Sequence, residues 1–319
     1  VNLMEGRRGR GGPDARKMRR DRGKHWLAMA EAYAAPKAQV APAIRPSPRP
    51  PVAVRPRQLS ITEIQKLIRD PYAIYARHIL KLAPLDPLRP EADPRLRGTV
   101  LHKILETYLR EGEGGEAALM SIADRVLEAE VAWPLARAIW RARIEKAAPG
   151  FLAFSADTGG KPVLVEERGA VTLQGQDFTL KGKPDRIDML DDGRLLIIDY
   201  KTGAPPSAEQ QKHFDRQLYL AAAMAENGAF AGLPLAEVAK LAYVGVKADF
   251  KVSPVDLEPG EVTRVWEEFK DLIAAYARPT RGYSARAAMD KDSDASDYDH
   301  LSRFCEWDET AAVTPEDLA

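Results

Sequence analysis

The sequence has 319 residues, of which 45% are hydrophobic, and its 47 basic residues balance 47 acidic ones, so net charge argues neither for nor against a nucleic-acid partner. The single cysteine, Cys305, excludes an internal disulfide framework and any metal site built from several thiolates of this chain. No apolar run approaches the roughly 20 residues that span a bilayer, and no signal-peptide core follows the basic N-terminus, so we expect a cytoplasmic protein.

The basic N-terminus is followed by a proline-rich stretch. Residues 1 to about 24 carry nine basic side chains against three acids, a composition typical of a disordered tail. Such a tail could contact phosphates, although a solvated tail is the simpler interpretation. A short helix is predicted from Trp26 to Tyr33, and the seven prolines between Pro36 and Pro56 predict an extended, semi-rigid linker.

Helices dominate the sequence after the linker. Ser60-Ile61-Thr62-Glu63 has the pattern of a capping box, in which the Ser60 hydroxyl accepts from first-turn amides and Glu63 reaches back, so a helix is expected to begin here. The Asp70-Pro71 pair is expected to end it. Further helices are expected over residues 72–79, 98–110 and 117–148.

The character of the sequence changes to strands near residue 163. Short apolar runs separated by glycine and aspartate turns predict strands at residues 163–165, 171–173, 178–180, 185–190 and 194–201. A helix over residues 208–227, a strand over 241–246 and a helix over 259–277 follow. The sequence therefore predicts a tail and linker over residues 1–57, an α/β domain over 58–310 with a helical N-terminal portion, and a C-terminal tail over 311–319.

Charged residues end the most apolar of these strands. In the run from Leu195 to Lys201, the alternation of a strand places Asp199 and Lys201 on one face and Tyr200 on the other. Burying an unpaired charge costs several kcal/mol, so a metal ion, a phosphate or the opposite charge must compensate these two groups.

The turn before this strand decides whether a second acid joins the first. If Asp191, Asp192 and Gly193 form a three-residue loop with Gly193 left-handed, Asp185 lies opposite Asp199 on the same face. A two-residue loop of Asp192 and Gly193 would turn Asp199 to the other face.

Two neighbouring carboxylates and the Tyr200 carbonyl would form an all-oxygen site suited to Mg²⁺ or Mn²⁺. Lys201 could position or help deprotonate an attacking water, or stabilise charge on a phosphoryl oxygen. Taken singly, Asp199 and Lys201 are better explained as a salt-bridged strand end, and Asp185 as a turn acid. Their combination favours catalysis.

Four motifs resemble, in the same order, those of the RecB-type PD-(D/E)xK nucleases: Gly98-Thr-Val-Leu-His102, Gly182-Lys-Pro-Asp185, Asp199-Tyr-Lys201 and Gln217-Leu-Tyr219. The resemblance covers about residues 59–307. It is strongest to the C-terminal nuclease domain of AddB, a subunit of a bacterial double-strand-break repair helicase–nuclease, and it includes the segments 69–77 and 298–303.

The resemblance implies a restriction-endonuclease-like fold, with a central mixed sheet flanked by helices, and a Mg²⁺-dependent DNA exonuclease of repair and recombination. It implies that Asp185, Asp199 and the Tyr200 carbonyl bind the metal, that Lys201 assists catalysis, and that His102 is a further ligand. By itself, a lone helix histidine is more often packed or solvated than metal-bound.

The resemblance also involves three supporting residues. Glu106, one helical turn after His102, could orient that histidine or be an ordinary surface acid. Gln217 and Tyr219 are implied to support the site or to contact DNA, although without the resemblance Tyr219 would be a core residue.

The sequence departs from AddB in two respects. Many AddB-type nucleases bind an iron–sulfur cluster through four cysteines, which this chain lacks, so no cluster is expected. Packing of Tyr298, His300 and Trp307 against the region of Tyr72 is expected to join the ends of the domain instead. No phosphate-binding loop of an ATPase is present, so we expect a nuclease segment without the usual N-terminal portion.

The resemblance implies an AddA-type helicase–nuclease subunit as partner, with DNA as substrate. An alternative is a DNA-binding or scaffold module that is active only when assembled with such a helicase. The intact set of Asp185, Asp199 and Lys201 argues against a decayed site. A nuclease that acts alone in RNA or phage metabolism is a third, weaker hypothesis.

Overall fold

The computed structural model describes residues 23–35, 41–84, 91–111, 114–203, 216–246, 250–289 and 294–318. The chain divides into two compact units, residues 1–43 and 44–319. In the first unit, the predicted short helix is confirmed as α2 (Lys24–Ala34), none of whose residues is buried. The predicted disorder of the basic tail concerns mainly residues 1–22, which lie outside the described residues. All further description concerns the second unit.

The capping box at the start of α3 (Ile61–Arg69) is confirmed. The Ser60 hydroxyl accepts from the Glu63 amide at 3.3 Å, and the Glu63 carboxylate accepts from the Ser60 amide at 2.9 Å. The helix ends at the predicted place, because Pro71 starts α4 (Pro71–Ile74), which continues into the π-helical turn η2 (Tyr75–Ile79). The expected aromatic helix over residues 72–79 is therefore two short consecutive pieces.

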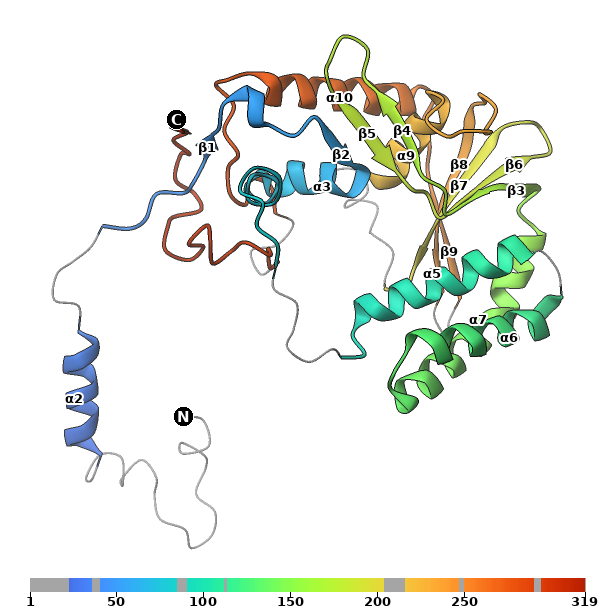
Figure 1. Ribbon diagram of the computed structural model, residues 1–319, viewed down its shortest axis with the longest axis horizontal. Helices are drawn as coiled ribbons and strands as arrows, with labels where there is room; N and C mark the ends of the chain where they lie inside the picture. Colours follow the sequence, from blue (N-terminus) through green and yellow to red (C-terminus); the bar gives the residue numbers. More distant parts are fainter. Residues whose placement is uncertain are drawn as a thin grey trace, which may run out of the picture. The chain divides into compact units, whose positions relative to one another are not determined.

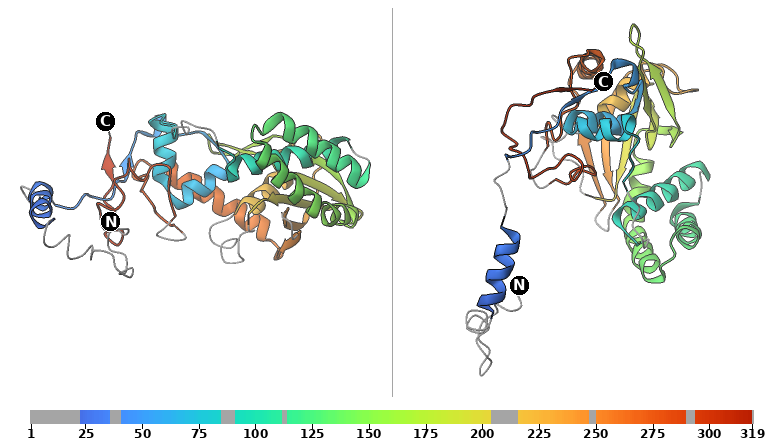
Figure 2. Two further views of the ribbon diagram at one scale, coloured as in Figure 1. Left: turned by 90° about the horizontal axis from the view of Figure 1, so that it is seen from below. Right: turned by 60° about the vertical axis from the view of Figure 1, so that its left-hand side comes forward.

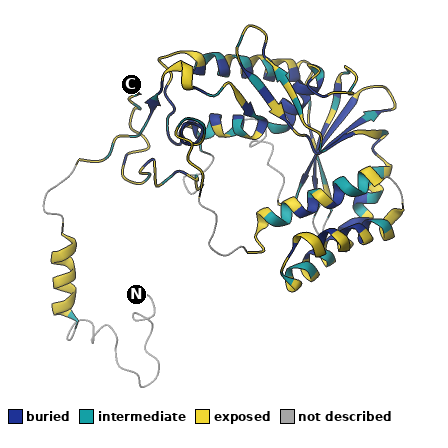
Figure 3. Ribbon diagram, viewed as in Figure 1, coloured by how far each residue is buried: buried dark blue, intermediate teal, exposed yellow. Residues whose placement is uncertain are grey.

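A five-stranded mixed sheet forms the centre of the second unit (Figure 1). Its strands, in spatial order, are β3 (Gly160–Val165), β6 (Arg186–Leu190), β7 (Leu195–Lys201), β8 (Val238–Gly245) and β9 (Lys251–Val255). β7 runs parallel to β8, and the other neighbours are antiparallel. The central strand β7 is buried along nearly its whole length, as its apolar sequence predicts (Figure 3).

Three helices cover one face of this sheet in each view (Figures 1 and 2). They are α5 (Pro94–Glu111), α6 (Gly115–Glu130) and α7 (Pro134–Ala156), and they share a hydrophobic core with Leu196, Ile198 and Tyr200 of β7. The helical stretch expected over residues 117–148 is two helices, because the chain turns at residues 131–133 before Pro134 starts α7.

The opposite side of the sheet carries the remaining long helices. α9 (Gln217–Glu226) packs against β7 and β8, and α10 (Glu261–Ala277) packs against α9. The N-terminal part of the helix expected over 208–227 lies outside the described residues up to residue 215. A small second sheet joins β2 (Gln58–Ser60), β5 (Thr179–Gly182) and β4 (Gly169–Thr172). The predicted α/β architecture, a mixed sheet between helices, is confirmed.

The proline-rich segment, expected to be an extended, semi-rigid linker, belongs to the folded unit over residues 44–57. It packs along the folded body: β1 (Pro48–Arg49) pairs with β10 (Glu316–Asp317), within the expected C-terminal tail. Arg55 is buried and donates to the carbonyl oxygens of Tyr276 and Arg278 at 2.7 and 2.9 Å. Prolines suit this segment because an extended chain at an edge needs few amide donors.

The expected packing against the region of Tyr72 is confirmed for the segment of Tyr298 and Leu301, whereas Trp307 packs with Arg45 of the proline-rich segment. The Tyr298 hydroxyl donates to the Leu82 carbonyl at 2.8 Å, and the Tyr72 hydroxyl lies 3.5 Å from the Leu301 carbonyl. Trp307 is buried under the Arg45 guanidinium, at 5.4 Å from the ring centre. His300, by contrast, is engaged through its carbonyl within its own turn.

Among the described helices, none combines the length and the apolar composition that crossing a bilayer requires.

Asp70 is predicted to be a main anchor between the two ends. It is buried at the end of α3, and its carboxylate accepts from the Arg286 amide at 2.9 Å and from the Ser296 hydroxyl at 2.5 Å. Asp70→Ala leaves both donors without this acceptor and should lower the free energy of unfolding by about 2 kcal/mol or more in urea denaturation. The control Asp271→Ala, at an exposed position of α10, should change it by less than about 0.5 kcal/mol. Equal losses would contradict the prediction.

Candidate active site

The turn between β6 and β7 has the predicted register. Residues 191–193 form a three-residue loop, closed by a hydrogen bond from the Leu190 amide to the Arg194 carbonyl at 2.8 Å, and Gly193 has a φ of 83°. Arg186 pairs with Ile198, so the register continues to place Asp185 beside Asp199. A side chain at position 193 would strain the turn, because this φ lies in the left-handed region.

Asp185 connects the two strands and the helix that faces them. Its carboxylate accepts from the Tyr200 amide at 2.6 Å and lies 3.3 Å from His102 Nδ1. The side chain is 10% exposed. The carboxylate is therefore held in one orientation by groups from β7 and α5.

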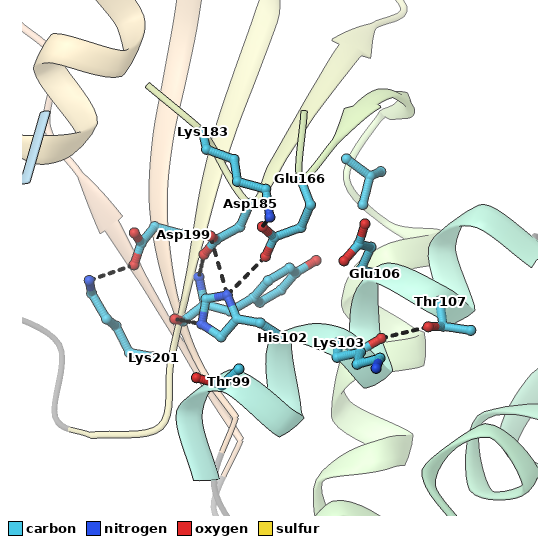
Figure 4. Close-up of polar contacts among 12 residues, drawn as sticks. Thr99, His102, Lys103, Glu106, Thr107, Glu166, Lys183, Asp185, Asp199 and Lys201 are labelled. Carbon is cyan, nitrogen blue, oxygen red and sulfur yellow. Dashed lines mark hydrogen bonds and ion pairs between the residues drawn. The ribbon is translucent and has the colours of Figure 1, made fainter. Parts of the chain in front are cut away.

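His102 reaches the ends of these strands from α5. Leu101, Ile104 and Leu105 of this helix are buried in the core, which turns His102 toward the sheet (Figure 4). Its Nδ1 lies 3.1 Å from Glu166 Oε1, and its Nε2 lies 3.0 Å from the Tyr200 carbonyl oxygen. The structure thus brings His102, Asp185 and the Tyr200 carbonyl together, as the sequence motifs predict.

Glu166 is a member of the site that sequence reasoning missed. It follows β3 with a φ of 51°, a left-handed conformation that is strained for a non-glycine residue, and its amide donates to the Asp185 carbonyl at 3.0 Å. Its carboxylate also pairs with Lys183 Nζ at 2.6 Å. Val165 of β3 pairs with Arg186 of β6, so the residue after β3 lies beside Asp185. A prediction that these two strands pair would therefore have identified Glu166 as a member of the site.

Asp199 and Lys201 form the second half of the site. Lys201 Nζ lies 2.8 Å from Asp199 Oδ2, and Gln217 Nε2 donates to Asp199 Oδ1 at 2.9 Å. Gln217 at the start of α9 thus supports the carboxylate, in agreement with one of its two expected roles. Asp199 neighbours Asp185 but lies outside the tight group that His102, Glu166 and Asp185 form.

Glu106 and Tyr219, the two other expected supporting residues, lie outside the site. Glu106 pairs with Arg110 at 3.1 Å on the surface of α5, so the acid that orients His102 is Glu166 instead. Tyr219 is buried in α9 and donates to the Asp256 carbonyl at 3.2 Å, which is the packing role that the residue type alone predicts.

The electrostatics of the site reflect its crowded acids. Burial and the charge of Asp185 raise the pKa of the Asp199 carboxyl above its usual range. Burial alone would lower the pKa of His102, but hydrogen bonds to Asp185 and Glu166 raise it to about 10. The imidazole ring contacts the carboxylates of Asp185 and Glu166 and the Tyr200 carbonyl, all of which are acceptors. Both ring nitrogens therefore carry protons in this arrangement. The cluster stabilises positive charge at its centre.

A divalent metal ion fits this set of donors. One donor atom from each of His102, Glu166 and Asp185 lies within 4.8 Å of the others, and the Tyr200 carbonyl is at hydrogen-bond distance from the same imidazole. Two carboxylate oxygens and one imidazole nitrogen suit Mg²⁺ or Mn²⁺ better than a thiolate-binding metal. This candidate set contains Glu166 in addition to the expected His102 and Asp185, whereas the Tyr200 carbonyl lies at the opposite ring nitrogen.

A cavity of about 680 Å³ opens over the two aspartates. Its lining includes Asp185 and Asp199 and, on the wall formed by the small sheet, the basic residues Arg168, Lys181 and Lys183. Basic side chains along a groove attract and position a phosphate backbone. The cavity thus brings the two aspartates together with a wall suited to a polyanion.

The model of the PD-(D/E)XK nuclease superfamily matches residues 58–310 of the chain. An uncharacterized protein of Rickettsia bellii is 29% identical over 164 residues, which are 49% of this chain and 20% of that protein. An uncharacterized protein of Rickettsia conorii is 29% identical over 168 residues, with the same coverage of both chains.

A more distant relative carries a functional name. This protein of Streptococcus equi subsp. zooepidemicus, one of the subunits of an ATP-dependent helicase/deoxyribonuclease, is 25% identical over 163 residues, which are 47% of this chain and 14% of that protein. The chain thus spans a fifth or less of the length of these relatives. Among solved structures, SSO0001 aligns over 80% of this chain and 87% of its own, with 14% identity and a TM-score of 0.30.

Glu166→Gln is predicted to weaken metal binding. The substitution keeps the size of the side chain but removes a charge that is 3.1 Å from His102, so calorimetric titration with Mn²⁺ should show a loss of affinity of about 10- to 100-fold. Glu167→Gln, at the neighbouring exposed position, removes the same charge and serves as the control. Equal Mn²⁺ affinities for the two variants would show that Glu166 does not contribute to the site.

Metal affinity is also predicted to rise with pH. The imidazole of His102 must lose a proton to become a ligand, and its pKa is raised to about 10, so the proton competes with the metal throughout the range below that value. Between pH 6.5 and 8.5 the Mn²⁺ association constant should increase by up to about tenfold per pH unit for this one proton. In His102→Asn, the slope of the logarithm of the Mn²⁺ association constant against pH should be smaller by about one, because one proton fewer is released on binding. An unchanged slope in that variant would contradict the prediction.

Proposed function

Since the chain belongs to the PD-(D/E)XK nuclease superfamily, we propose that it is a Mg²⁺- or Mn²⁺-dependent deoxyribonuclease that degrades DNA from its ends. The observation that carries this proposal is the hairpin that places Asp185 beside Asp199, the partner of Lys201, at a cavity with a basic wall that both aspartates line. Phosphodiester hydrolysis needs a cation near the phosphate, a group that positions water and a surface that binds the backbone. The cavity offers residues for each of these three tasks.

The residues divide the chemistry between them. His102, Glu166, Asp185 and the Tyr200 carbonyl would hold the metal, with Asp199 beside them. The bound cation would polarise the scissile phosphate and offset the charge that develops on it. Lys201 would position the attacking water, or stabilise the charge on a phosphoryl oxygen, from its place beside Asp199.

Gln217 and the basic wall have positioning roles in this proposal. Gln217 fixes the rotation of the Asp199 carboxylate through its hydrogen bond at 2.9 Å, so that the second carboxylate oxygen faces Lys201. Arg168 and Lys181, both exposed on the small sheet, would bind phosphates of the strand on either side of the cut.

We further propose that this nuclease acts in double-strand-break repair and recombination. This role is supported by the sequence motifs of the RecB and AddB type and by the similarity to the streptococcal helicase/deoxyribonuclease protein. An AddA-type helicase–nuclease would then be the protein partner. A cytoplasmic location, expected from the composition, belongs to the same proposal.

Cleavage of end-labelled linear DNA tests the proposal. The purified chain with Mg²⁺ or Mn²⁺ should release short products from single- or double-stranded DNA, and Asp199→Ala and Lys201→Ala should each reduce the rate by about a hundredfold or more. Asp191→Ala removes an exposed carboxylate from the same hairpin and should cut at the wild-type rate.

The outcomes separate the alternatives. Residual cleavage that is equal in the wild type, Asp199→Ala and Lys201→Ala would refute the catalytic assignment. Activity that appears only after an AddA-type helicase is added would favour a module that depends on assembly. Internal fragments in place of terminal products would identify an endonuclease.

A further inference from the structure

A second cavity adjoins the candidate active site. It has a volume of about 420 Å³ and lies between α5, α7 and the ends of β7 and β8. Thr202 and Gly203, which directly follow Lys201, form part of its wall, and so does Leu101, the residue before His102. The cavity and the cation site therefore share one strand end and one helix.

The described walls of this cavity are largely apolar. Trp140, which is 7% exposed, lines it together with Ile144 and Val100, and the lining residues within the described part of the chain include no acid. Arg97 from α5 and Arg143 from α7 supply the two charges. A volume of this size lies within the range of pockets that bind small ligands, roughly 300–1,000 Å³.

Among the described residues, the side chains of Arg97 and Arg143 make no ion pair. The same holds for Arg95 and Arg137 on these two helices, whereas Arg141 on α7 pairs with Asp124 at 2.7 Å and with Glu145 at 3.1 Å. An apolar slot with an indole in its wall and two uncompensated guanidinium groups is complementary to a planar base that carries a phosphate.

We propose that this cavity binds an unpaired nucleotide of the DNA strand that is cut, with its base against Trp140 and Ile144 and its phosphate at Arg97 and Arg143. This inference rests on the proposed nuclease function. A base inside a duplex is stacked and paired, and its extrusion into such a cavity costs a few kcal/mol, so a strand that is single or frayed next to the cut binds more favourably. The cavity thus selects single-stranded DNA or opened ends as substrate.

Binding measurements without divalent metal test the cavity separately from cleavage. Fluorescence anisotropy in EDTA compares a labelled 12-nucleotide single strand, a blunt duplex of the same sequence and an abasic strand of equal length and charge. For the wild type, the abasic strand should bind about tenfold more weakly than the normal strand, because it has the phosphates but no bases to stack.

Two double variants provide the matched comparison. Arg97→Ala/Arg143→Ala should lower the ratio of single-strand to duplex affinity by about tenfold. Arg125→Ala/Arg141→Ala removes the same charge from α6 and α7 away from the cavity and should leave this ratio within about twofold. Circular dichroism of each variant verifies that it is folded.

Two results would overturn the inference: an abasic strand that binds as tightly as the normal strand, or an affinity ratio that is equal in the two double variants. If either occurs while the wild type still cleaves DNA, the cavity has another purpose and the nuclease function stands. If the base-dependent and arginine-dependent losses occur but no metal restores cleavage, the cavity is supported and the nuclease function fails. Free thymidine monophosphate that displaces the strand at micromolar concentration would identify a mononucleotide site and overturn the assignment to a strand.

Discussion

The hydrogen bond from the Tyr200 amide to the Asp185 carboxylate, at 2.6 Å, is the interaction on which the site depends. It exists only in one register of the β6–β7 hairpin, because a slip by one residue would move Asp199 and Lys201 to the face covered by α5–α7. The same register presents the Tyr200 carbonyl to His102 at 3.0 Å. One short turn therefore positions the acids, the lysine and the helix histidine relative to one another.

The back of this hairpin shows how the fold tolerates so much buried charge. Arg186 and Asp188, both fully buried on β6, form a bidentate pair at 2.6 and 2.7 Å, and Arg186 also donates to Ser155 of α7 at 2.6 Å. Charges away from water are stable only with such complete partners. The hydrogen bond from Arg186 to Ser155 connects α7 with the strand that directly follows Asp185. It therefore fixes the position of this helix relative to the site.

Local signals in the sequence proved sufficient for several elements. The capping box at Ser60 and Glu63 and the face shared by Asp199 and Lys201 follow from periodicity and capping chemistry. Turn chemistry left a two-residue and a three-residue loop open before Gly193, and the structure has the three-residue loop. These features involve residues within a few positions of one another. By contrast, the pairing of β1 with β10 was missed, because these two strands are remote in the sequence. The strand β9 was also missed, although it forms a hairpin with its chain neighbour β8.

The sequence by itself determined the α/β character of this protein and the carboxylates and lysine of its candidate site. Only the tertiary structure decided which acid meets His102: Glu166, after β3, rather than Glu106, one turn along the same helix. It also decided that Arg97 and Arg143 face one apolar cavity next to Lys201. The physical reason is that local features depend on residues close in the sequence, so they can be predicted from it. Contacts such as that of Glu166 with His102 join distant segments and depend on how strands pair and how helices pack across the sheet.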